Sequence, residues 1–126
     1  MSYDHYRFTK DHEWVFLKDD IATVGITEYA TNELGDVVYV ELFEDNKNIS
    51  QKDEVGTIES VKTVSSLYSP LSGDLIENNL QVIKDPNIIN EDPLNIGWLL
   101  KLKPSKIKEL DSLMTLKEYE IYTKDL

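Results

Sequence analysis

The sequence contains a series of short runs of β-branched and aromatic residues, and this pattern constrains the fold more than any other feature. Each run is bounded by turn residues, which is typical of β-strands. The runs cover residues 13–17, 21–26, 36–42, 55–60, 63–68, 74–77 and 98–103. A tight turn at 18–20 is expected to join the first two into a hairpin. No long helical segments separate the runs, so parallel βαβ units are excluded. A mainly β fold, a flattened barrel or β-sandwich of short antiparallel strands, is predicted.

One short helix and two irregular segments are expected between these runs. Thr27 is a good helix N-cap and Gly35 a good helix stop, which predicts a helix over 28–34. Residues 43–54 are polar and are predicted to form a surface loop. Residues 78–93 contain two prolines and are predicted to form a long connection.

The residues after Pro104 are predicted to form a helical tail over about 105–122. Four apolar residues there share one helical face, namely Ile107, Leu110, Leu113 and Met114. Thr115 and Glu118 fit a capping box that starts a second short helix. At 126 residues, the chain is expected to be one domain over 1–126.

The charge balance excludes several classes of function. Thirteen Lys and Arg residues stand against 24 Asp and Glu residues, which gives a formal net charge of −11. Binding to nucleic acid or to an anionic membrane surface requires clustered cations, so both are excluded as partners. A strongly acidic chain is expected to be monomeric and to be attracted to basic surfaces of partner proteins.

Few residues in the chain are suited to catalysis. The sequence has no cysteine, no Gly-rich phosphate loop and only two histidines, His5 and His12. A metal site that uses these histidines with Glu13 is conceivable, but surface or packing roles are the simpler interpretation. We therefore expect that the chain is not an enzyme on its own.

The sequence shows no targeting or membrane-spanning pattern. Residues 1–7 lack an apolar or Arg/Ser-rich leader, and no apolar run approaches the length of about 20 residues that a membrane span needs. A cytoplasmic location, with no segment preceding residue 1, is expected.

Lys62 lies between two runs with alternating apolar residues, at the expected apex of a hairpin. A turn apex holds a side chain away from the fold, where another protein can reach and acylate its amine. Lysines at turns are common, however, so this placement alone does not predict a modification.

The residues around Lys62 resemble the lipoylation hairpin of the glycine cleavage system H protein family. Glu59, Ser60 and Val61 precede the lysine, and residues 67–73 follow with Leu-Tyr-Ser-Pro-Leu-Ser-Gly. Further family-like segments occur in the same order at 12–14, 24–27, 34–42, 90–93, 97–98 and 118–119. The resemblance covers nearly the whole chain, from about Tyr6 to Tyr122.

This resemblance implies a hybrid barrel-sandwich whose hairpin carries lipoate in amide linkage on Lys62. Glu59, Ser60 and Val61 would form the attachment motif, which a lipoate ligase or a lipoyl/octanoyl transferase would recognise. The carrier would shuttle the aminomethyl group of glycine from a PLP-dependent glycine decarboxylase to a tetrahydrofolate-dependent aminomethyltransferase. A dihydrolipoamide dehydrogenase would then reoxidise the dithiol.

The resemblance also implies a cleft near residues 12–14 that protects the loaded arm from water. Glu13 is the candidate partner for the carried ammonium group, because a partly buried carboxylate favours a nearby cation. The alternative for Glu13 is an ordinary surface position on a strand. Trp14 and Trp98 are interpreted as core or cleft-wall residues.

Some positions depart from the family pattern, and other functions stay open. Ser65 and Ser66 stand where an acid usually follows the motif lysine, and Leu94 replaces a usual tyrosine. These departures concern the cleft and the partner contacts. The alternatives are an H-like protein that relays lipoyl groups to other lipoate-dependent enzymes, a biotinyl or other acyl carrier, and an unmodified interaction module. Biotin sites resemble Met-Lys-Met, which the residues around Lys62 do not match.

Overall fold

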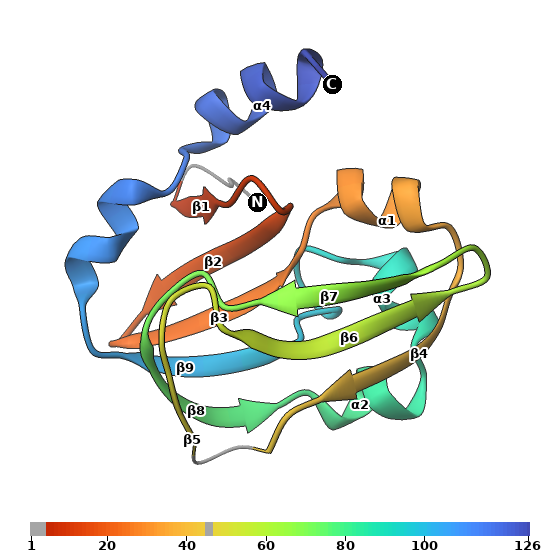
Figure 1. Ribbon diagram of the computed structural model, residues 1–126, viewed down its shortest axis with the longest axis horizontal. Coiled ribbons are helices and arrows are strands. Elements are labelled where there is room, and N and C mark those ends of the chain that lie inside the picture. Colours follow the sequence, from red (N-terminus) through yellow and green to blue (C-terminus); the bar gives the residue numbers. More distant parts are fainter. Residues whose placement is uncertain (1–4, 45–46) are drawn as a thin grey trace.

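Antiparallel strands make up the frame of the protein. The computed structural model describes residues 5–44 and 47–126, and the strands within them form two antiparallel sheets (Figure 1). One sheet has six strands in the order β1-β2-β3-β9-β8-β5, and the other has three in the order β4-β6-β7. The strands are β1 (Tyr6–Phe8), β2 (Glu13–Lys18), β3 (Ile21–Ile26), β4 (Val37–Leu42), β5 (Lys47–Ile49), β6 (Glu54–Ser60), β7 (Val64–Tyr68), β8 (Gly73–Asn78) and β9 (Leu100–Pro104). The predicted mainly β, sandwich-like fold is confirmed.

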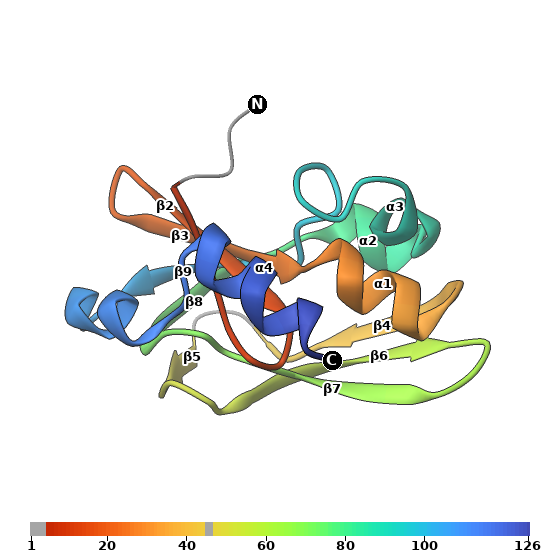
Figure 2. The same ribbon diagram turned by 90° about the horizontal axis from the view of Figure 1, so that it is seen from above.

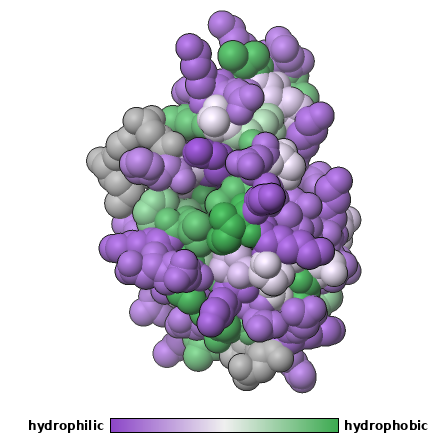
Figure 3. All heavy atoms as spheres, turned by 90° about the vertical axis from the view of Figure 1, so that its left-hand side faces the viewer, coloured by the Kyte–Doolittle hydropathy of each residue, from purple (hydrophilic) through white to green (hydrophobic). Residues whose placement is uncertain are grey.

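Short helices surround this frame (Figures 1 and 2). They are α1 (Glu28–Leu34), α2 (Leu80–Lys84), α3 (Asn87–Glu91), the 3₁₀ helix η1 (Ile107–Ser112) and α4 (Leu116–Lys124). Helices α2 and α3 pack beside β4, α1 contacts α3, and α4 packs on β1. The surface at the η1 end is mostly hydrophilic around a central apolar area (Figure 3).

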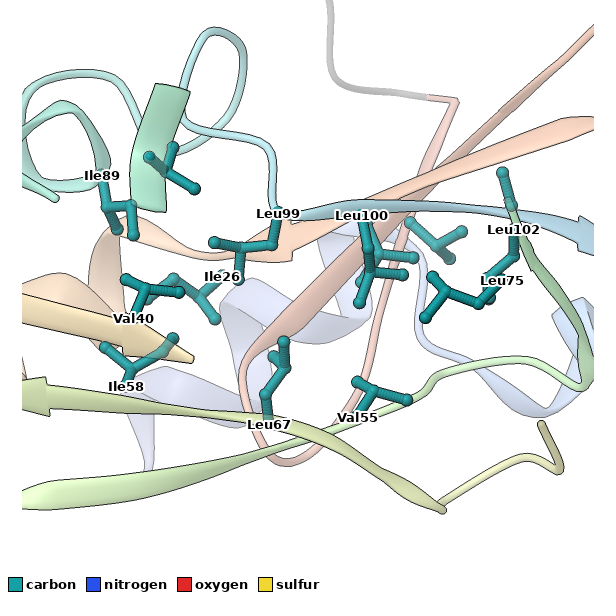
Figure 4. Packing of buried hydrophobic residues seen from close by; sticks show 14 of the residues in the cluster. Ile26, Val40, Val55, Ile58, Leu67, Leu75, Ile89, Leu99, Leu100 and Leu102 are labelled. Carbon is teal, nitrogen blue, oxygen red and sulfur yellow. The ribbon is translucent and has the colours of Figure 1, made fainter. Parts of the chain in front are cut away.

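The main core fills the space between the two sheets. Buried side chains from β4, β6 and β7 point toward those of β8 and β9 (Figure 4). They include Val40, Ile58, Leu67, Leu75, Leu100 and Leu102. Burial of apolar side chains on this scale is the main term that stabilises a small domain.

A second, aromatic cluster lies beneath α4, and its buried members are Tyr6, Phe8, Trp14 and Tyr119. The indole nitrogen of Trp14 donates hydrogen bonds to the carbonyls of Ile26 and Pro93 at 3.1 and 2.9 Å. This buried position confirms the interpretation of Trp14 as a core residue.

Two local predictions are confirmed in detail. Asp19 and Asp20 both have positive φ angles, 52° and 64°, as a two-residue hairpin turn requires. The Thr27 side chain accepts a hydrogen bond from the backbone N–H of Ala30, and Gly35, with φ of 77°, ends α1.

Two segments predicted as irregular are partly regular. The prediction of a loop over 43–54 is wrong for Lys47–Ile49, which forms β5 and pairs with β8. Asp45 and Asn46, which belong to the same predicted loop, lie outside the described residues. The long connection over 78–93 contains α2 and α3. Both misses involve very short elements that long-range pairing or packing stabilises, so local propensity gives a weak signal.

The two ends of the chain also differ from expectation. Strand β1 was not predicted, and β9 begins at Leu100, two residues later than expected. The apolar face predicted to reach Met114 is interrupted, because η1 ends at Ser112 and Met114 forms a backbone bridge with Phe8. The capping box of Thr115 and Glu118 is confirmed.

Candidate functional site

The tip of the β6–β7 hairpin is the most projecting part of the three-stranded sheet (Figure 1). Strand β6 ends at Ser60 and β7 begins at Val64, so Lys62 lies in the turn between them. Val61 is 66% exposed, and Lys62 and Thr63 are exposed as well. The structure therefore places Lys62 where the sequence analysis expected it, at an accessible hairpin apex.

Ser60 fixes the conformation of this turn from within. Its side chain is buried, and its hydroxyl oxygen accepts hydrogen bonds from the backbone N–H groups of Lys62 and Thr63 at 3.1 and 3.2 Å. The backbone N–H of Ser60 donates to the Thr63 carbonyl at 2.8 Å. A short hydroxyl side chain satisfies turn amides in this way at little conformational cost. The tip is consequently an ordered turn that presents Lys62.

The chain segment between α1 and β4 supports the tip from one side. The Val61 N–H donates a hydrogen bond to the Asp36 carbonyl at 3.0 Å. Next to Asp36, Gly35 has no side chain, and a Cβ built there would lie 3.2 Å from Cε of Lys62. The aliphatic stem of Lys62 therefore lies against the end of α1.

Glu59 occupies a different environment from Ser60. It is exposed, and the sheet register places it between Tyr39 of β4 and Val64 of β7. Tyr39 and Val64 are 52% and 61% exposed. Glu59 is thus available to a docking partner, whereas Ser60 has an internal structural role.

Glu13 is buried, so its alternative interpretation as a surface strand residue is wrong. Only 2% of the residue is exposed. The Thr9 hydroxyl donates to Oε1 at 2.6 Å, and the backbone N–H of Tyr68 donates to Oε2 at 3.2 Å. Burial raises the pKa of Glu13 to about 7, although both hydrogen bonds oppose this shift.

A cleft of about 260 Å³ connects the surroundings of Glu13 with the hairpin. Its walls come from residues 11–13, from α1 and from both hairpin strands. Thr63, next to Lys62, and Glu13 both line it, as does Ser66. A second hollow, of about 470 Å³, lies beside Glu13 and Thr9 below the η1 end. Glu13 therefore lines the same cleft as Thr63, the residue next to Lys62.

Leu94 and Trp98 do not line the cleft beside Glu13. They line a separate hollow of about 490 Å³ with His5, Trp14 and Lys101. The departure at Leu94 thus does not alter the cleft beside Glu13, whereas the departure at Ser66 does.

His12 has a packing role. Its Nδ1 lies 2.8 Å from the hydroxyl of Tyr119, which in turn lies 2.7 Å from the hydroxyl of Thr27. Its ring also packs against Tyr29, with centroids 4.5 Å apart. Burial lowers the pKa of His12. Across the described ranges, 5–44 and 47–126, no group of three or more His, Cys, Asp or Glu residues could hold a metal ion.

Two residues around Glu13 were missed by sequence reasoning. Thr9 closes the loop before β2, since its hydroxyl accepts a hydrogen bond from the N–H of Glu13 at 3.1 Å while donating to the carboxylate. A threonine at the start of a short polar loop was a usable signal. Tyr68 acts through its backbone N–H, which no sequence pattern marks.

Comparison with known proteins identifies the family to which the chain belongs. A family model described as the glycine cleavage H-protein matches residues 6–126. The chain belongs to this family. It is 44% identical over 114 residues to the glycine cleavage system H protein of Staphylococcus epidermidis, with 90% of each sequence covered. It is also 44% identical over 119 residues to that of Symbiobacterium thermophilum, with 94% of this chain and 93% of the relative covered.

A solved structure agrees with these relatives. The crystal structure of a glycine cleavage system H protein from Mycobacterium marinum superposes with a TM-score of 0.89 at 36% identity. The superposed region covers 98% of this chain and 99% of the Mycobacterium marinum chain. The protein is therefore a lipoyl carrier component of the glycine cleavage system that interacts with the other components. None of the helices within the described ranges has the length and apolar character to cross a membrane.

Proposed function

We propose that the ε-amine of Lys62 is the lipoyl attachment point and that Glu59, Ser60 and Val61 form the attachment motif. In this motif, Glu59 and Val61 would face the attaching enzyme, and Ser60 would order the turn. The observation that carries this assignment is the exposed Lys62 side chain on a turn whose backbone is fixed by Ser60 and Asp36. A lysine held in one place loses less conformational freedom when an enzyme binds it than a lysine on a mobile loop. Either a lipoate ligase or a lipoyl/octanoyl transferase would use this surface.

The cleft beside the hairpin fits the carried group. When bound, the lipoyl group supplies the disulfide sulfur that accepts the aminomethyl group left by glycine decarboxylation. The walls of the cleft would exclude water from that group. Glu13 would pair with its ammonium, held in place by Thr9 and the Tyr68 N–H. A cation next to a buried carboxylate favours the ionised form, so loading would lower the pKa of Glu13 from about 7.

We further propose that the protein catalyses no step itself and is a substrate for three enzymes. They are a PLP-dependent glycine decarboxylase, a tetrahydrofolate-dependent aminomethyltransferase and a dihydrolipoamide dehydrogenase. The net charge of −11 supports docking to basic surfaces on these enzymes and disfavours nucleic acid or anionic membranes as partners. We place the whole chain, 1–126, in one monomeric domain that acts in the cytoplasm.

The attachment site is tested by intact mass after incubation with lipoate, ATP and a lipoate ligase, followed by sequencing of the modified peptide. Wild-type protein is expected to gain one lipoyl group on Lys62. Lys62→Arg keeps the charge but lacks an acylable amine, so it should gain none. Lys108→Arg changes an exposed lysine on η1 and should behave as wild type. A lipoyl group on any lysine other than Lys62, or none at all with an active ligase, would overturn the assignment.

A further inference from the structure

Asn90 forms a two-point contact with a chain segment more than 50 residues away in sequence. Its Nδ2 donates a hydrogen bond to the Gly35 carbonyl at 3.0 Å, and its Oδ1 accepts one from the Val37 N–H at 2.9 Å. The sequence separations are 53 and 55 residues. The neighbouring Ile89 is fully buried in the main core, which anchors α3 and fixes the position of Asn90.

The segment that Asn90 holds is the same one that supports the lipoylation turn. Asp36 lies between the two clamped residues, and its carbonyl accepts the hydrogen bond from the Val61 N–H at 3.0 Å. Gly35 lies against the stem of Lys62. The regular pairing of β4 with β6 ends at Val37 and Ser60. Beyond that pair, the hydrogen bond from the Val61 N–H to the Asp36 carbonyl supports the tip of the β6–β7 hairpin.

We propose that Asn90 is a positioning residue for lipoylation. Its side-chain amide holds residues 35–37 in the conformation on which the tip rests, and thereby keeps Lys62 in the place where the attaching enzyme binds it. This inference rests on the proposed attachment at Lys62. An amide side chain offers a donor and an acceptor on one short stem, as these two contacts require. Aspartate could accept from Val37 but could not donate to Gly35, and alanine could do neither.

Amide hydrogen exchange on the full-length unmodified protein tests the structural half of the inference. In Asn90→Ala, the Val61 N–H should exchange about tenfold faster, because two net hydrogen bonds of this kind stabilise the closed tip by about that factor. The core amides of β3 and β9 should keep their wild-type exchange rates. Asn87→Ala is the matched control, since Asn87 is an exposed residue of the same helix that hydrogen-bonds Glu91.

The kinetics of lipoylation by a lipoate ligase test the functional half. We expect kcat/KM for Asn90→Ala to fall about tenfold, whereas Asn87→Ala keeps the wild-type value. If Asn90→Ala does not fold, the nearly isosteric Asn90→Asp decides the question. It should keep the bond from Val37 and lose the bond to Gly35, so we expect faster Val61 exchange and a lower kcat/KM, each by a smaller factor than in Asn90→Ala.

The possible results separate this inference from the assignment of Lys62. If wild-type Lys62 is lipoylated, and a folded Asn90 variant matches Asn87→Ala in both Val61 exchange and kcat/KM, the role of Asn90 is refuted alone. Faster Val61 exchange with unchanged lipoylation would also refute it, because the order of the tip would then not limit attachment. If wild-type Lys62 gains no lipoyl group, the attachment assignment fails first and the role of Asn90 fails with it.

Discussion

The carboxylate of Glu13 in β2 accepts a hydrogen bond from the backbone N–H of Tyr68, at the end of β7, at 3.2 Å. This contact joins the six-stranded sheet to the three-stranded sheet that contains the β6–β7 hairpin. It also places an ionisable group, with its pKa raised to about 7, at the cleft. A buried carboxylate is costly to keep charged, so a glutamate at this position favours a role in the site over a role in stability.

The first prediction concerns the stability cost of Glu13. Its pKa is about 7 in the folded state against 4.5 for an ordinary glutamate. Protonated Glu13 therefore favours the folded state below pH 4.5, and this contribution is lost as the pH rises through 7. A pKa change of this size corresponds to about 3 kcal/mol of unfolding free energy. Urea denaturation between pH 4 and 8 should show wild-type protein losing stability relative to Glu13→Gln over this interval. A constant difference between the two proteins would contradict the account.

The second prediction concerns protection of the carried group. In loaded Glu13→Gln, the aminomethyl group should be hydrolysed about tenfold faster than in wild type. The reason is that a carboxylate partner of the ammonium is replaced by an uncharged amide, which binds it more weakly. The measurement is the decay of loaded carrier, followed by mass spectrometry without the aminomethyltransferase. Glu41→Gln, at an exposed position on β4, should decay at the wild-type rate. Equal decay of the Glu13 variant and wild type would exclude Glu13 as the partner.

The third prediction concerns the hydroxyl of Ser60. Ser60→Ala leaves the N–H groups of Lys62 and Thr63 without their shared acceptor, which should cost about 1–2 kcal/mol of stability. It should also lower kcat/KM for lipoylation several-fold. Ser65→Ala, at an exposed position on the same hairpin, should lower neither. Urea denaturation and ligase kinetics measure the two effects. A Ser60 variant lipoylated as fast as Ser65→Ala would show that turn order does not matter for attachment.

The fourth prediction concerns the hydroxyl of Tyr119, which joins α4 to His12 and Thr27. Burial raises the pKa of Tyr119 to about 12, so the hydroxyl is neutral at pH 7. Tyr119→Phe should lower the unfolding free energy by about 1–3 kcal/mol, because buried polar partners lose their hydrogen bonds. Tyr122→Phe removes only an exposed contact to the Lys10 carbonyl and should cost less. Equal losses of unfolding free energy in Tyr119→Phe and Tyr122→Phe, measured by denaturation, would contradict this role of the Tyr119 hydroxyl.

Much of the fold could be predicted because its signals are local. Alternating apolar residues marked both arms of the hairpin, and Thr27 and Gly35 marked both ends of α1. Strand β5 could not be found in this way, because its three residues are ordered by pairing with β8 rather than by their own propensity. The same holds for β1, which pairs with β2 and packs beneath Tyr119.

The candidate site was predictable to a similar degree. Lys62 could be placed from the pattern of the hairpin and the motif before it. The burial of Glu13 could not, because a charged residue on a strand looks like a surface residue until Thr9 and Tyr68 are seen to satisfy it. Asn90 belonged to a family-like segment, but its contacts with Gly35 and Val37 arise only when α3 packs beside β4.

The most direct test of the carrier role is decarboxylation of carboxyl-labelled glycine by a glycine decarboxylase that depends on added carrier. Lipoylated wild-type protein should support labelled CO₂ release that saturates with carrier concentration. Lys62→Arg, treated with the same ligase, should support no more release than the decarboxylase alone. Full activity with Lys62→Arg would contradict attachment at Lys62. No activity with wild-type protein shown to be lipoylated would contradict the glycine cleavage role and favour a lipoyl relay.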